Sequence, residues 1–111
     1  MSSGGYQAGE VVLLSFPFAD ASGARRRPAL VLVDTGDEDV VVARVTSQPL
    51  RSIFDVEIID WQRAGLLLPS VVRLAKVATL EKRLVERRLG RLATDDWVRV
   101  RTAVQRLWAS I

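Results

Sequence analysis

The residue types that this chain lacks limit the chemistry it can perform. The sequence has no Cys and no His, so the thiolate and imidazole ligands of transition metals are missing, and we expect no metal site and no cofactor. The same absence excludes a Cys nucleophile, a Ser-His-Asp triad and a histidine pair acting as acid and base. Any catalysis must therefore rest on Arg, Lys, Asp, Glu, Ser, Thr or Tyr.

Arginine is the residue type best suited to binding in this chain. The 16 basic residues exceed the 13 acidic ones, the pI is 10.2, and all but Lys76 and Lys82 of the basic residues are Arg. Arg25, Arg26 and Arg27 are consecutive. Because guanidinium binds phosphate in a bidentate manner, this pattern fits a polyanionic partner. An arginine-rich proteome is the alternative, and composition does not separate the two.

Length and patterning predict one small domain. We expect a flexible N-terminus over residues 1–8 and a single domain over residues 9–111. No secretory signal and no membrane-spanning apolar stretch is evident, so we expect a cytoplasmic protein without a membrane partner. Hydrophobic residues make up 49% of the chain, which suffices for a core. Small domains often gain stability by self-association, so a homodimer is plausible.

Short apolar or alternating segments predict at least five antiparallel strands. The predicted strands are Glu10–Phe16, Ala29–Val33, Val40–Val45, Asp55–Ile59 and Val71–Ala78. Turn residues at 34–37 predict a hairpin that delivers Thr46 at its far end. Residues 18–27 are expected to form an exposed loop, residues 60–65 a helical turn ended by Gly65, and residues 84–92 fit either a strand or a helical turn.

The last segment predicts a helix. Thr94 is expected as its N-cap, with Asp95 and Asp96 in the first turn, where the helix dipole favours negative charge. Apolar residues at helical spacing from Trp97 to Ile111 are expected to pack on the sheet. The predicted fold is therefore mainly β with a C-terminal helix, a small SH3-like barrel.

Ordered blocks along nearly the whole chain resemble the MazF/PemK toxins of type II toxin–antitoxin systems. The blocks are Gly9–Leu14, Phe16–Phe18, Arg27–Leu32, Val45–Gln48, Trp61, Gly65–Leu67, Pro69–Leu74, Ala78–Thr79–Leu80 and Leu89–Leu92. Each block is weak alone, whereas the ordered set is specific. The resemblance implies a barrel of the MazF/PemK/CcdB type, a homodimer that cuts single-stranded RNA at short motifs, and a cognate antitoxin.

In the family that this chain resembles, the Arg before Pro and the Thr ending the third strand carry the reaction. The resemblance therefore implies that Arg27 and Thr46 are the catalytic residues here. The ribose 2′-hydroxyl attacks the adjacent phosphate without a metal and leaves a cyclic phosphate and a free 5′-hydroxyl. A guanidinium stays protonated and is a poor base, so Arg27 would stabilise transition-state charge. Asp20 is the only carboxylate of the first loop that could take the proton, although an Asp in a turn often only bonds its own backbone.

The remaining candidates concern RNA binding. Arg25, Arg26 and Arg51 are suited to holding the RNA backbone. Ser47 and Gln48 would bond phosphate or base edges, or would only cap the loop. Arg73 is either a further RNA contact or a partly buried arginine that satisfies carbonyls or an ion pair. These are the predicted RNA-binding residues.

Two other functions fit the same sequence. CcdB-type toxins share the barrel and bind gyrase instead of cutting RNA, and fold alone does not decide between them. A catalytically weak RNA-binding regulatory module is the second alternative, because the first loop is shorter than in many relatives of the family. The expected antitoxin would place a flexible, acidic C-terminal segment over Arg27.

Overall fold

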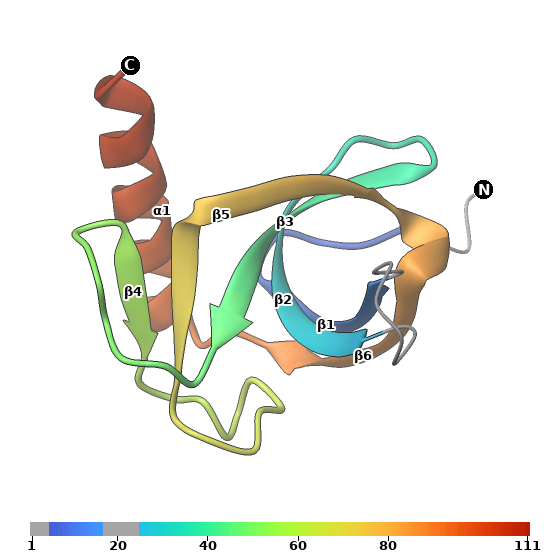
Figure 1. Cartoon of the computed structure of the whole chain (residues 1–111), viewed down its shortest axis with the longest axis horizontal. Coiled ribbons are helices and arrows are strands. Elements are labelled where there is room, and N and C mark those ends of the chain that lie inside the picture. The colour runs from blue at the N-terminus through green and yellow to red at the C-terminus, as the bar shows by residue number, and fades with distance from the viewer. Residues whose placement is uncertain (1–4, 17–24) are drawn as a thin grey trace.

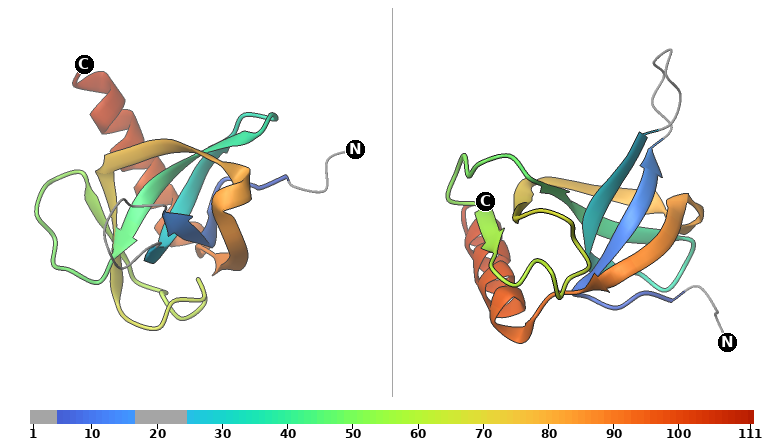
Figure 2. Two further views of the ribbon diagram at one scale, coloured as in Figure 1. Left: turned by 45° about the vertical axis from the view of Figure 1, so that its right-hand side comes forward. Right: turned by 90° about the horizontal axis from the view of Figure 1, so that it is seen from below.

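The computed structural model describes residues 5–16 and 25–111 and consists of one antiparallel sheet and one helix (Figure 1). The strands are β1 (Glu10–Phe16), β2 (Arg25–Asp34), β3 (Asp39–Thr46), β4 (Asp55–Ile58), β5 (Ser70–Glu81) and β6 (Val85–Arg91); η1 (Lys82–Leu84) is a 3-10 helix and α1 (Thr94–Ala109) an α-helix. The strand order is β4-β5-β3-β2-β1-β6. The sheet curls into an incomplete barrel, with α1 on its outer side next to β4 (Figures 1 and 2). The predicted mainly-β fold is confirmed.

Two apolar clusters hold the sheet in this shape, one on each face. The first lies beneath α1 and joins Val11, Leu30 and Leu74 to Val100 of the helix. The second lies on the opposite face. It contains residues that are adjacent in sequence to members of the first cluster, for example Val12 and Val31. Because side chains of a strand alternate between faces, these near-continuous apolar runs fill both clusters.

Strand β2 begins earlier than the sequence predicted. Arg25 and its two neighbours were expected in a loop, but they pair with β1 from Phe16↔Arg25 to Leu14↔Arg27. Residues 17–24, which include the rest of that predicted loop, lie outside the described residues. Pro28 pairs with Leu13 on β1, whereas the pairs with β3 begin only at Ala29↔Arg44. Proline has no N–H to give to a ladder, so β2 and β3 separate beyond this point.

Two segments whose predictions allowed a turn of helix take the following forms. Residues 60–65 form hydrogen-bonded turns, and Gly65 ends them with a positive φ of 83°. The ambiguous segment 84–92 contains the end of η1 and all of β6. Strand β6 pairs with β1 through two register shifts, and these irregularities explain why its apolar residues followed neither the helical nor the strand period.

The helix differs from its prediction at both ends. Ala93, not Thr94, is the N-cap, and no side chain caps the helix. The buried Asp96 carboxylate instead accepts the backbone N–H groups of Ile59 at 3.1 Å and Asp60 at 2.9 Å. At the other end α1 projects beyond the sheet (Figure 1), so Trp108 and Ile111 are 76% and 92% exposed. Their predicted packing on the sheet is therefore wrong.

Within residues 5–16 and 25–111, no helix is long and apolar enough to cross a membrane.

Candidate active site

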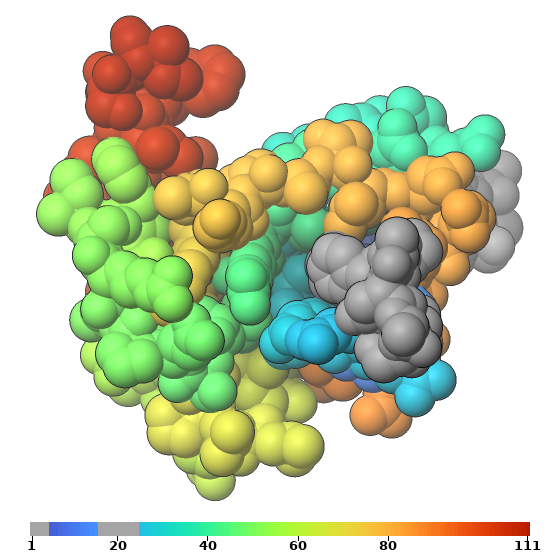
Figure 3. Space-filling view, in the orientation of Figure 1, coloured from blue at the N-terminus to red at the C-terminus, as the bar shows by residue number. Residues whose placement is uncertain are grey.

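A cavity of about 450 Å³ lies at the rim of the sheet, where β2 begins and β3 ends. It brings Arg27, Thr46 and Ser47 together with Arg87 of β6, and the segment from Gly65 to Leu68 forms its side. In Figure 3 the start of β2 (cyan), the end of β3 (green) and the segment before β5 (yellow-green) meet on one face. The cavity thus joins the two predicted catalytic residues.

The register of β2 and β3 explains why Arg27 and Thr46 meet. The ladder pairs Val31 with Val42 and Ala29 with Arg44, and the same register continued by two residues sets Arg27 opposite Thr46. Paired residues of an antiparallel sheet point to the same face. Because the ladder itself stops at Ala29, the strands separate and leave space between these two side chains.

The Thr46 hydroxyl is already oriented by its own loop. Thr46 is half-buried, and its Oγ1 accepts the backbone N–H of Gln48 at 3.2 Å. A hydroxyl that accepts one hydrogen bond still has its own hydrogen to donate. Thr46 can therefore offer an O–H donor at the cavity.

Two guanidinium groups of the cavity have no acidic partner in the part of the chain that the structure describes. Among the described residues, no carboxylate lies within ion-pair distance of Arg27 or Arg87. Arg27 is half-buried and Arg87 is exposed. Two permanent positive charges without a counter-charge favour an anion, and phosphate fits the fork geometry of each group.

Sequence reasoning missed Arg87, which belongs to the same cavity. It lies in the segment whose secondary structure was ambiguous, and only the pairing Leu13↔Arg87 places it beside the start of β2. A prediction that residues 84–92 form a strand beside β1 would have placed Arg87 near the start of β2.

Two glycines set the side wall of the cavity. Gly65 and Gly90 allow the backbone at 64–65 to touch β6, since a Cβ on Gly65 would lie 2.0 Å from the Leu89 carbonyl oxygen and one on Gly90 2.6 Å from the Ala64 carbonyl. This contact carries the apolar segment that follows Gly65 to the rim. Leu67, on that segment, is 91% exposed.

The loop after β3 is held by a buried ion pair. The Arg73 guanidinium lies 2.5 Å from the Asp55 carboxylate and donates to the Pro49 carbonyl oxygen at 3.0 Å. Both side chains of this pair are almost fully buried. Arg51 is fixed on the same loop, because its backbone N–H donates to Asp55 at 2.7 Å and its side chain to Gln48 Oε1 at 2.9 Å. The Arg73 guanidinium therefore binds a carboxylate and a carbonyl oxygen of the protein itself, which is the second of its two predicted roles.

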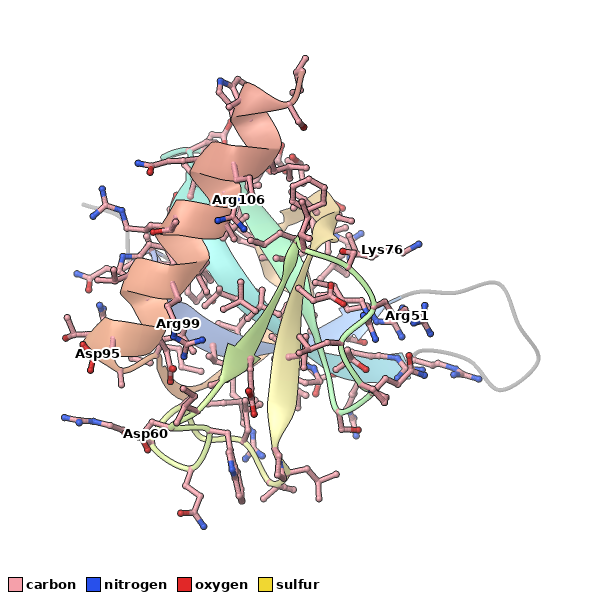
Figure 4. All side chains as sticks on the ribbon, turned by 90° about the vertical axis from the view of Figure 1, so that its left-hand side faces the viewer. Arg51, Asp60, Lys76, Asp95, Arg99 and Arg106 are labelled. Atoms are coloured by element: carbon pink, nitrogen blue, oxygen red, sulfur yellow. The ribbon has the colours of Figure 1, made fainter. Side chains whose placement is uncertain are left out.

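The other predicted RNA-binding residues lie around the cavity. Arg25 and Arg26 are exposed at the start of β2, and Arg26 lies 2.9 Å from Glu86. Figure 4 shows Arg51 on the side of the molecule opposite Asp95 and Arg106 of α1. Asp20, the candidate general base, lies outside the described residues. No group of three or more Asp and Glu side chains able to hold a metal ion occurs in the part of the chain that the structure describes.

Solved structures similar to this chain include toxins of the same architecture. A MazE–MazF complex from Deinococcus radiodurans is 26% identical, with a TM-score of 0.74 over 94% of this chain and 96% of that one. An endoribonuclease in complex with its cognate antitoxin, from a mycobacterial species, is 20% identical, with a TM-score of 0.71 over 95% and 96%. Comparison with curated protein sequences gives no significant match.

Comparison with family models gives a match that covers most of the chain. Residues 7–108 match the model of the PemK-like, MazF-like toxin of type II toxin–antitoxin systems. That range includes β1 to β6, the rim cavity and nearly all of α1. The chain therefore belongs to the PemK-like, MazF-like family of type II toxins.

Proposed function

We propose that this toxin is an endoribonuclease that cuts single-stranded RNA at short sequence motifs without a metal. The observation that carries the proposal is the cavity that joins Arg27 and Thr46, with the Arg87 guanidinium beside them. Membership of the MazF-like family and the endoribonucleases among similar structures support it. No metal takes part in the reaction we propose, because Arg27 and Thr46 supply the donors that the phosphate needs.

The proposed reaction is an internal transfer at one phosphodiester. The ribose O2′ attacks the adjacent phosphorus, the bond to O5′ breaks, and the products are a 2′,3′-cyclic phosphate and a free 5′-hydroxyl. Arg27 and the Thr46 hydroxyl donate to phosphate oxygens as negative charge gathers on them. A general base accepts the proton of the 2′-hydroxyl, a role for which Asp20 is our candidate. The Arg27 guanidinium donates a proton to the leaving O5′ and regains one from solvent.

Neighbouring residues would hold the rest of the RNA. Arg25, Arg26 and Arg51 are exposed cations suited to backbone phosphates. Ser47 and Gln48 lie at the end of β3 and would contact phosphate or base edges. We give Arg73 a positioning role instead, because its buried pair with Asp55 fixes the loop that carries Arg51.

A cognate antitoxin would inhibit the toxin by covering the same cations. An acidic, flexible antitoxin segment is electrostatically suited to Arg27 and Arg87, which pair with no carboxylate among the described residues. Antitoxin and RNA should then compete, in the cytoplasm where both occur. RNA binding that saturating antitoxin leaves unchanged would contradict this part of the proposal.

We also propose that the toxin is a homodimer that uses the end of α1. A groove of about 830 Å³ runs between β3, β5 and this helix, and its lining is almost entirely apolar. Trp108 and Ile111 line it and are largely exposed. A contiguous apolar surface of this kind marks an interaction site, and a second copy of the chain would cover it.

The direct test is to incubate the purified toxin with a long, defined single-stranded RNA in EDTA and to map the cut ends. We expect discrete cuts with free 5′-hydroxyl ends that disappear in Arg27→Ala and persist in Arg106→Ala, a charge-matched control on the exposed face of α1. If the wild type does not cut, the nuclease proposal fails, and gyrase binding or RNA binding without turnover takes its place.

A further inference from the structure

The arginine of β3, Arg44, lies two residues before Thr46, and its Nε has no partner among the described residues. Of the buried side-chain nitrogens and oxygens in the described residues, Arg44 Nε alone has no hydrogen-bond partner. No described carboxylate forms an ion pair with Arg44 either. Buried polar groups are almost always hydrogen-bonded, so an unsatisfied guanidinium N–H in a folded protein calls for an explanation.

The alternation of β3 places Arg44 on the same face as the catalytic pair. Val40 and Val42 belong to the second apolar cluster, so Arg44 and Thr46 follow on that face at two-residue steps. On β2, Ala29 and Val31 belong to the same cluster, which puts Arg27 there as well. Arg44 thus lies one step from Thr46 on the face that Arg27 shares, about 7 Å along the strand.

Neither neighbour of Arg44 across the sheet supplies a counter-charge, and the residue is half-buried with its Nε enclosed. On β2 it is paired with Ala29, whose methyl group leaves room above the strand. On β5 it is paired with Arg73, and the Asp55 carboxylate already binds that guanidinium at 2.5 Å. The Asp55 carboxylate therefore pairs with Arg73 and not with Arg44, and none of the described carboxylates neutralises the positive charge of Arg44.

We propose that Arg44 binds a backbone phosphate of the RNA, next to the phosphate that is cut. The Nε–H and one terminal N–H of a guanidinium form a fork that matches two phosphate oxygens. A bound phosphate would satisfy the buried Nε and neutralise the extra charge. Thr46 would then contact the phosphate that is cut, and Arg44 would contact the next phosphate along the RNA. This inference rests on the proposed nuclease function.

The fork would also fit a carboxylate of the antitoxin, but the position favours RNA. Arg44 lies on the face and strand that bear Thr46, so an RNA strand that runs from Thr46 along β3 would bring its next phosphate to Arg44. An antitoxin segment has no such requirement. Loss of antitoxin binding with unchanged RNA binding in an Arg44 variant would overturn the assignment.

The test compares Arg44→Met, which removes the charge and keeps the length of the side chain, with Arg44→Lys and with the control Arg106→Met on α1. The probe is a short RNA that contains a mapped cut site, with a 2′-deoxyribose there so that it binds without being cut. We expect Arg44→Met to weaken binding about tenfold or more, as for loss of a charge-assisted hydrogen bond. The slope of log K against log salt should fall by about 0.7, the value for one phosphate contact on a single strand.

Further readouts separate a binding role from a structural one. On the cleavable RNA, Arg44→Met should raise KM with a smaller effect on kcat, and Arg44→Lys should recover part of the loss. The melting temperature of Arg44→Met should equal or exceed that of the wild type, because an unsatisfied buried N–H is removed.

Unchanged affinity and salt slope in Arg44→Met, with a wild type that cuts, would overturn this inference alone. A lowered melting temperature with normal RNA binding would do the same and would make Arg44 structural. A wild type that neither binds nor cuts RNA would instead overturn the proposed function on which the inference rests.

Discussion

At the scale of single residues, Asp34 links three separate parts of the chain. Its carboxylate lies 2.8 Å from the Lys82 ammonium and accepts the backbone N–H groups of Tyr6 at 2.6 Å and Gly36 at 2.8 Å. The hydrogen bond from Lys82 first, and then those two N–H groups, lower the pKa of Asp34 from 3.8 to about 2. Each of these contacts favours the charged form.

This lowered pKa predicts a defined loss of stability in acid. The stabilising effect of Asp34 should be complete above pH 3.8 and should be lost as the pH falls toward 2, because the unfolded chain takes up the proton first. We expect Asp34→Asn to flatten the pH dependence of the urea midpoint in this window. Asp60→Asn, on an exposed residue, is the control for net charge, and equal slopes in both variants would refute the assignment.

Gly65 combines an unusual backbone angle with a close approach to β6. Its φ is 83° and that of Gly36 is 87°, but only at Gly65 would a Cβ meet backbone, since nothing lies within 4 Å of one on Gly36. Gly36→Ala should cost about 1–2 kcal/mol from the backbone angle. Gly65→Ala should cost about 3 kcal/mol or more, because the chain must also move away from Leu89. Equal losses of unfolding free energy in urea would show that the contact with β6 is unimportant.

The site residues differ in how well the sequence could reveal them. Arg27 and Thr46 could be proposed from their places in ordered family blocks, and the register of β2 and β3, continued by two residues beyond the last pair, sets them opposite each other. Arg73 allowed two roles, because its partner Asp55 is 18 residues away and on another strand. The cavity position of Arg87 depends on an irregular pairing with β1 that no local pattern encodes.

At the scale of elements, strands could be predicted where an apolar run and flanking turn residues indicate the same boundaries. The apolar run of β1 and the turn residues between β2 and β3 identified these strands because each is bounded by turn residues. The early start of β2 was not visible, because the polar residues Arg25 and Arg26 become a strand only by pairing with β1. A long-range partner decided that boundary.

The joint between α1 and the turn at 59–60 depends on Asp96. Its carboxylate binds two backbone N–H groups of the turn and the Arg99 guanidinium. Asp96→Ala should lower the unfolding free energy by about 2–5 kcal/mol, since it leaves buried donors and a cation unpaired. Asp95→Ala, on an exposed residue of the same turn of helix, should cost less than about 1 kcal/mol. Similar losses for both, measured in urea, would mean that helix-dipole effects dominate.

At the scale of the whole molecule, the proposed dimer rests on the apolar groove at the end of α1. Trp108→Lys would place a charge on this surface and should shift the toxin toward monomer in light scattering after gel filtration. Val98→Lys is the matched control, because Val98 is 52% exposed on the same helix but does not line the groove. A dimer that survives Trp108→Lys unchanged would locate the interface elsewhere.

The most direct test of the central claim is the single-turnover cleavage rate of a short RNA, in EDTA, by wild type, Arg27→Ala, Thr46→Val and the double variant. We predict that Arg27→Ala and Thr46→Val each lose about 100-fold or more, as for removal of one transition-state donor. The double variant should lose less than the product of the two, because both donors act on one phosphate. Cleavage at the wild-type rate by either single variant would contradict the claim that Arg27 and Thr46 together form the active site.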